Sequence, residues 1–141
     1  MDGAGISAAI RLGASGVQIG TAFILCPESS ASQPYRDLLK SERSKTTGIT
    51  KFISGRPARG IVNRAHAIRS PKNLLIRVPD YPIAYDAGKA LHDIFAKNGN
   101  HEFAAHWAGQ GAPLAREMPA SELFRTLVSE WKEMESHHFD L

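Results

Sequence analysis

The sequence has 141 residues, of which 43% are hydrophobic and 22% are charged, a globular composition that excludes a disordered or low-complexity chain. Its 17 Lys and Arg against 14 Asp and Glu give a formal charge of +3, and no basic run interleaves with aromatic residues, which disfavours nucleic-acid binding. The single cysteine, Cys26, excludes an internal disulfide and a multi-cysteine metal site. No apolar run reaches the roughly 20 residues that span a bilayer, and the start does not resemble a signal peptide, so we expect a cytoplasmic protein with no membrane partner.

The first expected elements are a helix and a strand. Asp2 can cap a helix, and apolar residues recur at helical spacing after it, which predicts a helix over residues 2–12. The following "SGVQIG" predicts a strand over residues 16–19, with the nearly continuous apolar pattern of a parallel strand covered on both faces. Helix then strand is the second half of a strand–helix–strand crossover, and the chain offers no good neighbours for this strand. The sequence is therefore short of strands for a complete fold.

The middle of the chain is predicted to form short helices and loops. Residues 22–25 and 34–39 predict two short helices, and residues 41–47 predict a polar linker. Residues 47–63 are extended at first and then become a Gly/Arg/Pro loop, and a basic stretch interrupted by prolines continues to Pro82.

The last third is predicted to be helical. One apolar stripe is ended by "KNGN" and consists of Ala87, Leu91, Ile94 and Phe95. A second stripe, which Ser121 could cap, consists of Leu123, Phe124, Leu127, Val128 and Trp131.

The end of the first strand carries the strongest candidate site, Gln18-Ile19-Gly20-Thr21. A glycine directly after a parallel strand lets backbone N–H groups approach an anion closely, and a helix that begins there adds its dipole. In (β/α)8 barrels, phosphate binds in such a place, after strands seven and eight. A tight strand–helix turn with no ligand is the alternative that the spacing leaves open.

Three stretches, in this order and spacing, resemble the nitronate monooxygenases, formerly called 2-nitropropane dioxygenases: "MDGAGISAAIRLGASGVQIGTAFILCPES", "TKFISGRPARGIVN" and "WAGQGAPLARE". Enzymes of this family are FMN-dependent (β/α)8 barrels. Related FMN barrels, such as the flavin-dependent enoyl-acyl-carrier-protein reductases, share the first stretch. The segments "SGRPARG" with Asn63 and the later "AGQG" favour the nitronate branch.

The resemblance implies an α/β fold, in which the chain is the C-terminal fragment of a (β/α)8 TIM barrel plus a mainly helical extension. Residues 1–33 would form the last helix–strand unit with the FMN-phosphate segment, and residues 34–141 the extension that packs on the barrel. The cofactor-binding residues it implies are Gln18, Ile19, Gly20 and Thr21, with Gly20 and Thr21 donating to the phosphate and Gln18 near the flavin.

The resemblance implies oxidation of alkyl nitronates by O2 to a carbonyl compound and nitrite, so the expected partners are a small anionic substrate and O2. The family's Gly-Gly-Ile phosphate loop would fall before Met1. None of the six histidines matches the context of its catalytic histidine, so we expect no catalytic residue and no activity in this chain alone. The alternatives are another FMN barrel, such as an enoyl reductase, and a truncated product without catalysis.

Two loops remain open to interpretation. Arg56 and Arg59 could present guanidinium groups to an anion such as a nitronate, or could clasp backbone carbonyls. Gln110, between two glycines, could reach a ligand or lie in a helix-ending turn.

Among the remaining candidates, Cys26 reads as a buried, inert thiol. His101 and His106 are five residues apart and make a poor metal pair. His137-His138 reads as part of a solvated tail, so no metal is expected.

Overall fold

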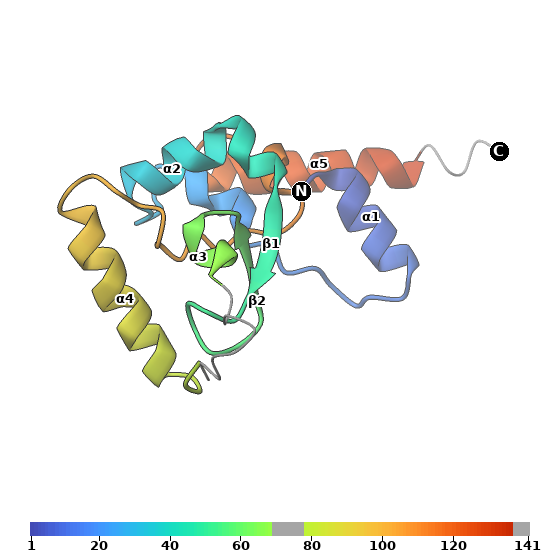
Figure 1. Ribbon diagram of the computed structural model, residues 1–141. Helices are drawn as coiled ribbons and strands as arrows, with labels where there is room; N and C mark the ends of the chain where they lie inside the picture. Colours follow the sequence, from blue (N-terminus) through green and yellow to red (C-terminus); the bar gives the residue numbers. More distant parts are fainter. Residues whose placement is uncertain (69–77, 137–141) are drawn as a thin grey trace. The chain divides into compact units, whose positions relative to one another are not determined.

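The computed structural model describes residues 1–68 and 78–136, which form two units. The first unit joins residues 1–40 to the described residues from Gly111 onward, and the second consists of residues 41–110. In the colours of Figure 1, the first unit takes in the blue start and the red end of the chain, and the second is mainly green and yellow. Each unit has its own buried side chains, Cys26 and Leu123 in the first and Ile53 and Ile61 in the second.

The chain begins with helix α1 (Gly3–Arg11), as its sequence predicts. The Asp2 side chain caps this helix by accepting a hydrogen bond from the Gly5 N–H at 2.9 Å. At the other end, the Leu12 N–H bonds the Ala8 carbonyl and Gly13 follows with a φ of 97°, a conformation that glycine adopts without strain.

The predicted strand over residues 16–19 is wrong for the described chain. These residues are irregular, and Val17 and Gln18 are exposed to solvent. The only sheet among the described residues is a two-stranded one in the second unit, so residues 16–19 have no strand beside them. A strand needs a partner for its backbone N–H and C=O groups, and without one this segment stays irregular despite its apolar pattern.

The short 3-10 helix η1 (Thr21–Leu25) and helix α2 (Gln33–Lys40) follow, where two short helices are predicted. Arg36 of α2 organises the loop between them. Its guanidinium donates to the carbonyls of Cys26 at 2.9 Å, Ser29 at 2.8 Å and Ala31 at 3.2 Å. A charged donor that bonds three carbonyls fixes this loop strongly, because charge-assisted bonds are stronger than neutral ones.

Helix α5 (Ala120–Ser136) confirms the last predicted apolar stripe. Leu123 and Leu127 are buried and contact Ala22 and Cys26 of the η1 region. The predicted cap at Ser121 is wrong, because both carboxylate oxygens of Glu28 lie 3.1 Å from the Ala120 N–H and accept its hydrogen bond. The helix therefore begins two residues earlier than a cap at Ser121 would place it, with an acidic cap from a distant loop.

Helices α1 and α5 lie directly against each other through a close backbone approach. Glu130 accepts hydrogen bonds from the Gly3 N–H at 2.9 Å and from both terminal nitrogens of Arg116 at 2.5 and 3.3 Å. Four residues further along α1, the Ser7 hydroxyl donates to Glu135 at 2.6 Å. Gly3 and Ser7 are both buried, so the two helices meet over small residues and are joined by carboxylates.

The second unit contains the antiparallel strands β1 (Thr47–Thr50) and β2 (Ala58–Ile61), paired with Gly48 opposite Gly60. The extended start at Thr47 is confirmed, but β2 lies where a loop is predicted. Strand β2 also pairs on its other edge, because the Ile61 N–H donates to the His106 carbonyl at 2.9 Å. Gly60 lies between these partners, where a side chain would come 2.7 Å from the His106 carbonyl oxygen.

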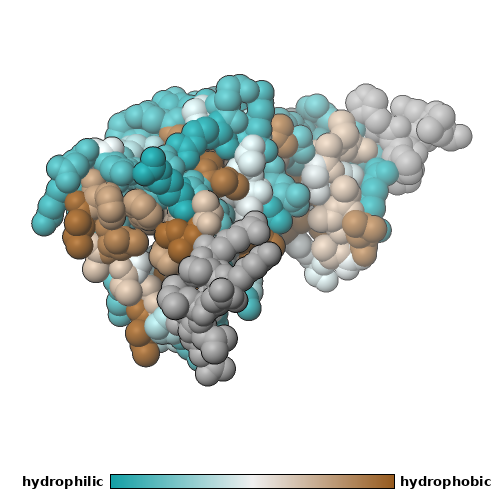
Figure 2. Space-filling view, in the orientation of Figure 1, coloured by the Kyte–Doolittle hydropathy of each residue, from teal (hydrophilic) through white to brown (hydrophobic). Residues whose placement is uncertain are grey.

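The remaining helices of the second unit are the short η2 (Glu42–Lys45), within the predicted polar linker, then α3 (Arg64–Ala67) and α4 (Ile83–Ala96). Helix α3 falls in the stretch predicted to be a basic loop, part of which, residues 69–77, lies outside the described residues. Helix α4 carries the predicted stripe and stops at the "KNGN" segment, with Gly99 at a φ of 70°. Figure 2 shows hydrophobic residues along it, and Ile83 and Ile94 are exposed. None of the helices in the described chain is long and apolar enough to cross a membrane.

The close approach of α1 and α5 predicts opposite effects for two alanine substitutions in one helix. In Gly3→Ala the new methyl group would overlap the Glu130 backbone, so we expect a loss of roughly 1–3 kcal/mol in the free energy of unfolding. Gly5→Ala meets nothing closer than 3.4 Å and should be neutral or stabilising by up to about 1 kcal/mol. Urea denaturation followed by Trp131 fluorescence in a Trp107→Phe background measures both, and equal effects would contradict the packing described.

The Glu130 contacts predict a pH-dependent stability. The hydrogen bond from Arg116 holds the pKa of Glu130 below its ordinary 4.5, so the stabilisation is present above that pH and is lost as the pH falls through the lowered value. Glu130→Gln should cost about 1 kcal/mol at pH 7, and its difference from the unsubstituted chain should shrink below pH 4.5. Glu133→Gln, on the same helix, is the matched control. A Glu130→Gln effect that is constant with pH would contradict the role of the charge.

Candidate functional site

The predicted phosphate segment lies at the start of η1. Ile19 is partly buried and packs against the core residues Ala22, Cys26, Leu123 and Leu127, which anchors the segment. Gly20 is exposed and is the residue that caps η1, with φ −108° and ψ −59°. A side chain at Gly20 would meet nothing within 4 Å, so the backbone here is open to an approaching group. Gln18 is exposed and Thr21 begins η1, so Gln18 and Gly20 are the accessible residues of the predicted segment.

A hollow of about 430 Å³ opens beside this segment. Its lining residues are Gly20, Phe23, Ile24, Cys26, Glu28, Ser29, Ser30 and Ala120. Part of its lining comes from the loop that Arg36 holds by its carbonyls, and Glu28 of this loop bonds the start of α5. The lining of the hollow is therefore fixed by hydrogen bonds of charged side chains. Its acidic side chain, Glu28, disfavours an anion close to it.

Cys26 belongs to the same lining and is buried. Burial raises the pKa of its thiol, the nearby Glu28 carboxylate raises it further, and Arg36 opposes the rise. A thiol with a raised pKa is a poor nucleophile, as the prediction of an inert cysteine requires.

A second, apolar hollow of about 450 Å³ lies between α1, α5 and the irregular segment. Its lining residues are Ile6, Ile10, Ser15, Gly16, Val17, Ile19, Phe23, Phe124, Leu127, Val128 and Trp131. The indole Nε1 of Trp131 is buried without a hydrogen-bond partner. Burying a donor without an acceptor costs free energy. The Trp131 indole therefore destabilises this part of the described chain.

In the second unit, the two arginines of the "SGRPARG" loop have different surroundings. Arg59 donates to the carbonyl and the hydroxyl of Thr47 at 3.2 and 3.1 Å, as the interpretation of a clasp predicts. Arg56 lies over the Tyr81 ring, with its guanidinium carbon 5.4 Å from the ring centre, a cation–π arrangement. Both arginines line a hollow of about 350 Å³ with Ser54, Ala58, Tyr81, Tyr85 and Trp107.

A cluster at the start of α4 and in the turn before it, which sequence reasoning missed, adjoins this hollow. Tyr81 and Tyr85 have stacked rings with centres 6.2 Å apart, and the Lys89 ammonium lies 5.0 Å from the centre of the Tyr85 ring. The hydrogen bond from Lys89 to Asp86 raises the pKa of this lysine. Tyr85 and Lys89 lie on one face of α4 because they are four residues apart, and this spacing was the available signal, whereas Tyr81 precedes the helix.

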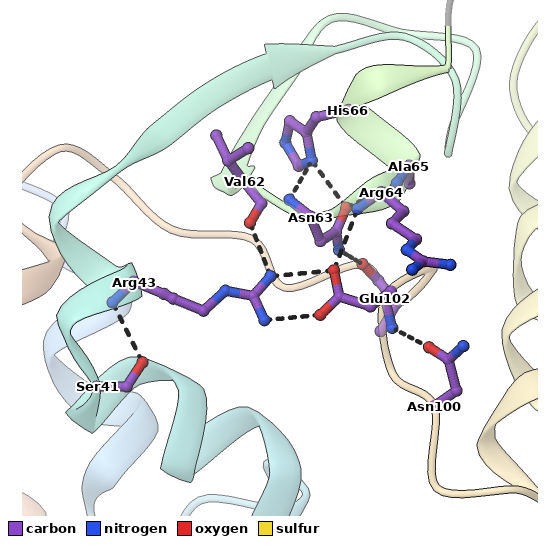
Figure 3. Close-up of polar contacts among 10 residues, drawn as sticks. Ser41, Arg43, Val62, Asn63, Arg64, Ala65, His66, Asn100 and Glu102 are labelled. Atoms are coloured by element: carbon purple, nitrogen blue, oxygen red, sulfur yellow. Dashed lines mark hydrogen bonds and ion pairs between the residues drawn. The ribbon is translucent and has the colours of Figure 1, made fainter.

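Glu102 is the centre of a polar network that fixes the loop after α4 (Figure 3). Its carboxylate oxygens accept bonds from the Arg43 guanidinium at 2.6 and 3.1 Å, and one also accepts from the Arg64 N–H at 3.3 Å. The bond from Arg43 lowers the pKa of Glu102. Asn63 caps α3 and donates to the Ala104 carbonyl at 2.9 Å, so these residues have a structural role.

The histidines of the second unit differ in burial. His106 is buried, and loss of solvation lowers its pKa to about 4, with the charges of His92 and His101 adding to the effect. Within residues 1–68 and 78–136, no three His, Cys, Asp or Glu side chains gather to hold a metal ion. His137 and His138 lie outside the described residues. The prediction that Gln110 lies in a helix-ending turn is wrong, because the turn at Gln110 precedes the short helix η3 (Ala112–Leu114).

Comparison with known proteins identifies the family. The sequence model of the family described as nitronate monooxygenase matches residues 1–130, and the chain belongs to this family. A Pseudomonas aeruginosa relative named nitronate monooxygenase is 57% identical over 130 residues, which cover 92% of this chain and 37% of that protein. A relative of the same name from Paraburkholderia phytofirmans is 47% identical, over 94% of this chain and 36% of that protein.

Two solved structures share the fold over most of the chain. A nitroalkane oxidase from Streptomyces ansochromogenes has a TM-score of 0.83 and 34% identity, covering 97% of this chain and 38% of that one. FabK from Thermotoga maritima has a TM-score of 0.67 and 26% identity, covering 99% of this chain and 44% of that one. The chain thus spans little more than a third of the length of its curated relatives.

Proposed function

We propose that this chain is the C-terminal portion of an FMN-dependent (β/α)8-barrel enzyme that oxidises alkyl nitronates with O2 to a carbonyl compound and nitrite. The observation that carries the proposal is the 57% identity, across 92% of this chain, to a relative named nitronate monooxygenase. Because the chain spans 37% of that relative, the activity is proposed for the chain combined with the rest of the barrel. The compartment proposed is the cytoplasm.

Within this proposal, residues 1–33 form the last helix–strand unit of the barrel, and residues 34–141 form the extension that packs on it. The irregular segment 16–19 supports this division, because its apolar sequence suits a parallel strand and it has no partner among the described residues. The apolar hollow beside it, with the buried Trp131 donor, is what a surface normally covered by further barrel strands would show.

The phosphate of FMN is assigned to Gln18, Ile19, Gly20 and Thr21. The fit rests on Gly20, where the open space would admit an oxyanion to the backbone at the beginning of η1. Gly20 and Thr21 would hold the phosphate, Ile19 would anchor the segment in the core, and Gln18 would lie near the flavin.

FMN supplies the electron transfer and the reaction with O2 when it is bound. The residues of this chain bind and orient. The Arg56 guanidinium, held over Tyr81 beside Tyr85, offers donors to the oxygens of a planar nitronate anion. No residue of this chain is assigned the abstraction of the substrate proton, which falls to the remainder of the barrel.

The similarity to FabK favours one second candidate, an FMN barrel that reduces an enoyl thioester at the expense of NAD(P)H. Oxidation of nicotinamide with an acyl thioester, and no nitrite from nitronates, would identify that activity. A truncated product without catalysis is the remaining alternative, and it would yield neither product.

The proposal predicts that the purified chain with FMN and an alkyl nitronate releases no nitrite above the buffer rate. Co-expression with the segment of the Pseudomonas aeruginosa relative that this chain lacks should restore nitrite release, because that segment supplies the rest of the barrel. Nitrite release by the chain alone would contradict the proposal that the activity requires the rest of the barrel. A folded, associated pair that produces no nitrite would overturn the nitronate assignment.

The phosphate assignment predicts weak FMN binding that one substitution abolishes. Gly20→Asp fills the open approach and adds a like charge, so quenching of flavin fluorescence on titration should disappear. The matched control is Gly16→Asp, which adds the same charge to the same segment at a position that is equally open but does not precede a helix. Equal titration curves for Gly20→Asp and the unsubstituted chain would contradict the assignment.

A further inference from the structure

Two histidines outside the proposed flavin and substrate sites face each other in the second unit. His92 lies on α4, and His101 follows the turn that ends this helix. The Nε2 atom of His92 and the Nδ1 atom of His101 are 3.3 Å apart and share a hydrogen bond, which a metal ion would replace, and the two rings are tilted by 49° with centres 5.6 Å apart. We propose that these two nitrogens form a binding site for a divalent transition metal of the zinc class, which clamps α4 to the loop after it.

The separation of the nitrogens matches the geometry of such a metal. Zinc binds imidazole nitrogen at about 2.0–2.1 Å in a tetrahedral arrangement, which sets two ligand nitrogens roughly 3.3 Å apart. The observed 3.3 Å equals this distance, so a metal ion requires no change in the separation of the two nitrogens. Neutral imidazole suits zinc, copper and nickel.

The surroundings of His92 favour one ring nitrogen as the ligand. Its Nδ1 atom lies 3.8 Å from the Asp93 carboxylate, which leaves Nε2 directed to His101. The His92 side chain is 30% exposed, so water has access to the remaining coordination positions. Two positions filled by water agree with the absence of a third converging ligand among the described residues.

The backbone on both sides of the pair is already fixed. The rings of Phe95 and Phe103 pack with centres 4.5 Å apart and join α4 to the loop that carries His101. Next to His101, Glu102 is held by Arg43, and the Glu102 N–H bonds the Asn100 side chain at 3.0 Å. A preorganised pair binds more tightly than a flexible one, because less conformational freedom is lost on binding.

The first measurement is a Zn²⁺ titration of the full chain by calorimetry, in a His137→Ala/His138→Ala background that removes the adjacent pair of histidines near the end of the chain. We expect one equivalent of Zn²⁺ to bind. His92→Ala and His101→Ala should each weaken binding by more than about a hundredfold, because each removes one of only two protein ligands and the loss exceeds that seen for residues that merely support a ligand. His66→Gln, which alters another histidine of the same unit, is the matched control and should bind as the background does.

Thermal denaturation followed by Trp107 fluorescence provides a second readout. Zn²⁺ that joins two elements of the folded state should raise the midpoint of the second unit in the background, and not in His101→Ala. His101→Gln keeps the size and polarity of the side chain, and circular dichroism establishes that each variant is folded. Unchanged Zn²⁺ affinity in His92→Ala and His101→Ala, or binding that vanishes in the background itself, would overturn the proposal.

Discussion

Backbone N–H and C=O groups need hydrogen-bond partners, and this requirement determines which parts of the described chain form strands. Residues 16–19 have the sequence of a strand buried on both faces, yet they are irregular because no strand lies beside them in the described chain. The hollow next to them is apolar and contains the buried Trp131 donor. The same requirement links the fold to the proposed activity. The proposed phosphate segment follows residues 16–19, so a sheet that paired these residues would also hold that segment in place.

The helices could be predicted from the sequence because their signals are local. Asp2 caps α1 within the first turn, and the stripes of α4 and α5 are read along one segment. Strand β2 and the start of α5 could not be predicted in this way, because each depends on residues far away in the sequence. Strand β2 contains Ala58 and Gly60, which are poor strand formers, and it forms because β1 pairs with one edge and the His106 backbone with the other. Glu28 displaces Ser121 as the cap of α5 for the same reason.

The candidate site shows the same contrast between residues that local sequence predicts and residues whose surroundings depend on the fold. Gln18 to Thr21 were found from a glycine and a helix start that are contiguous in sequence, whereas the surroundings of Arg56 were not foreseeable. Arg56 and Arg59 are equivalent in the sequence motif, and only the fold separates them: Arg59 is committed to Thr47, and Arg56 faces aromatic rings. The histidine pair shows the limit of sequence spacing as well. His92 and His101 are nine residues apart with a turn between them, a separation that predicts contact only when the path of the turn is known.

The order of the two units along the chain has a consequence for synthesis. Residues 41–110 are contiguous, so the ribosome completes the second unit while α5 is still to be made. The first unit depends on contacts between α1 and α5, which lie on either side of that insertion, and Glu130 and Glu135 reach their partners on α1 only after α5 has emerged. Until then the Gly3 backbone and the core residues around Cys26 lack their counterparts. The contacts that hold the beginning of this chain are therefore among the last to become available during its synthesis.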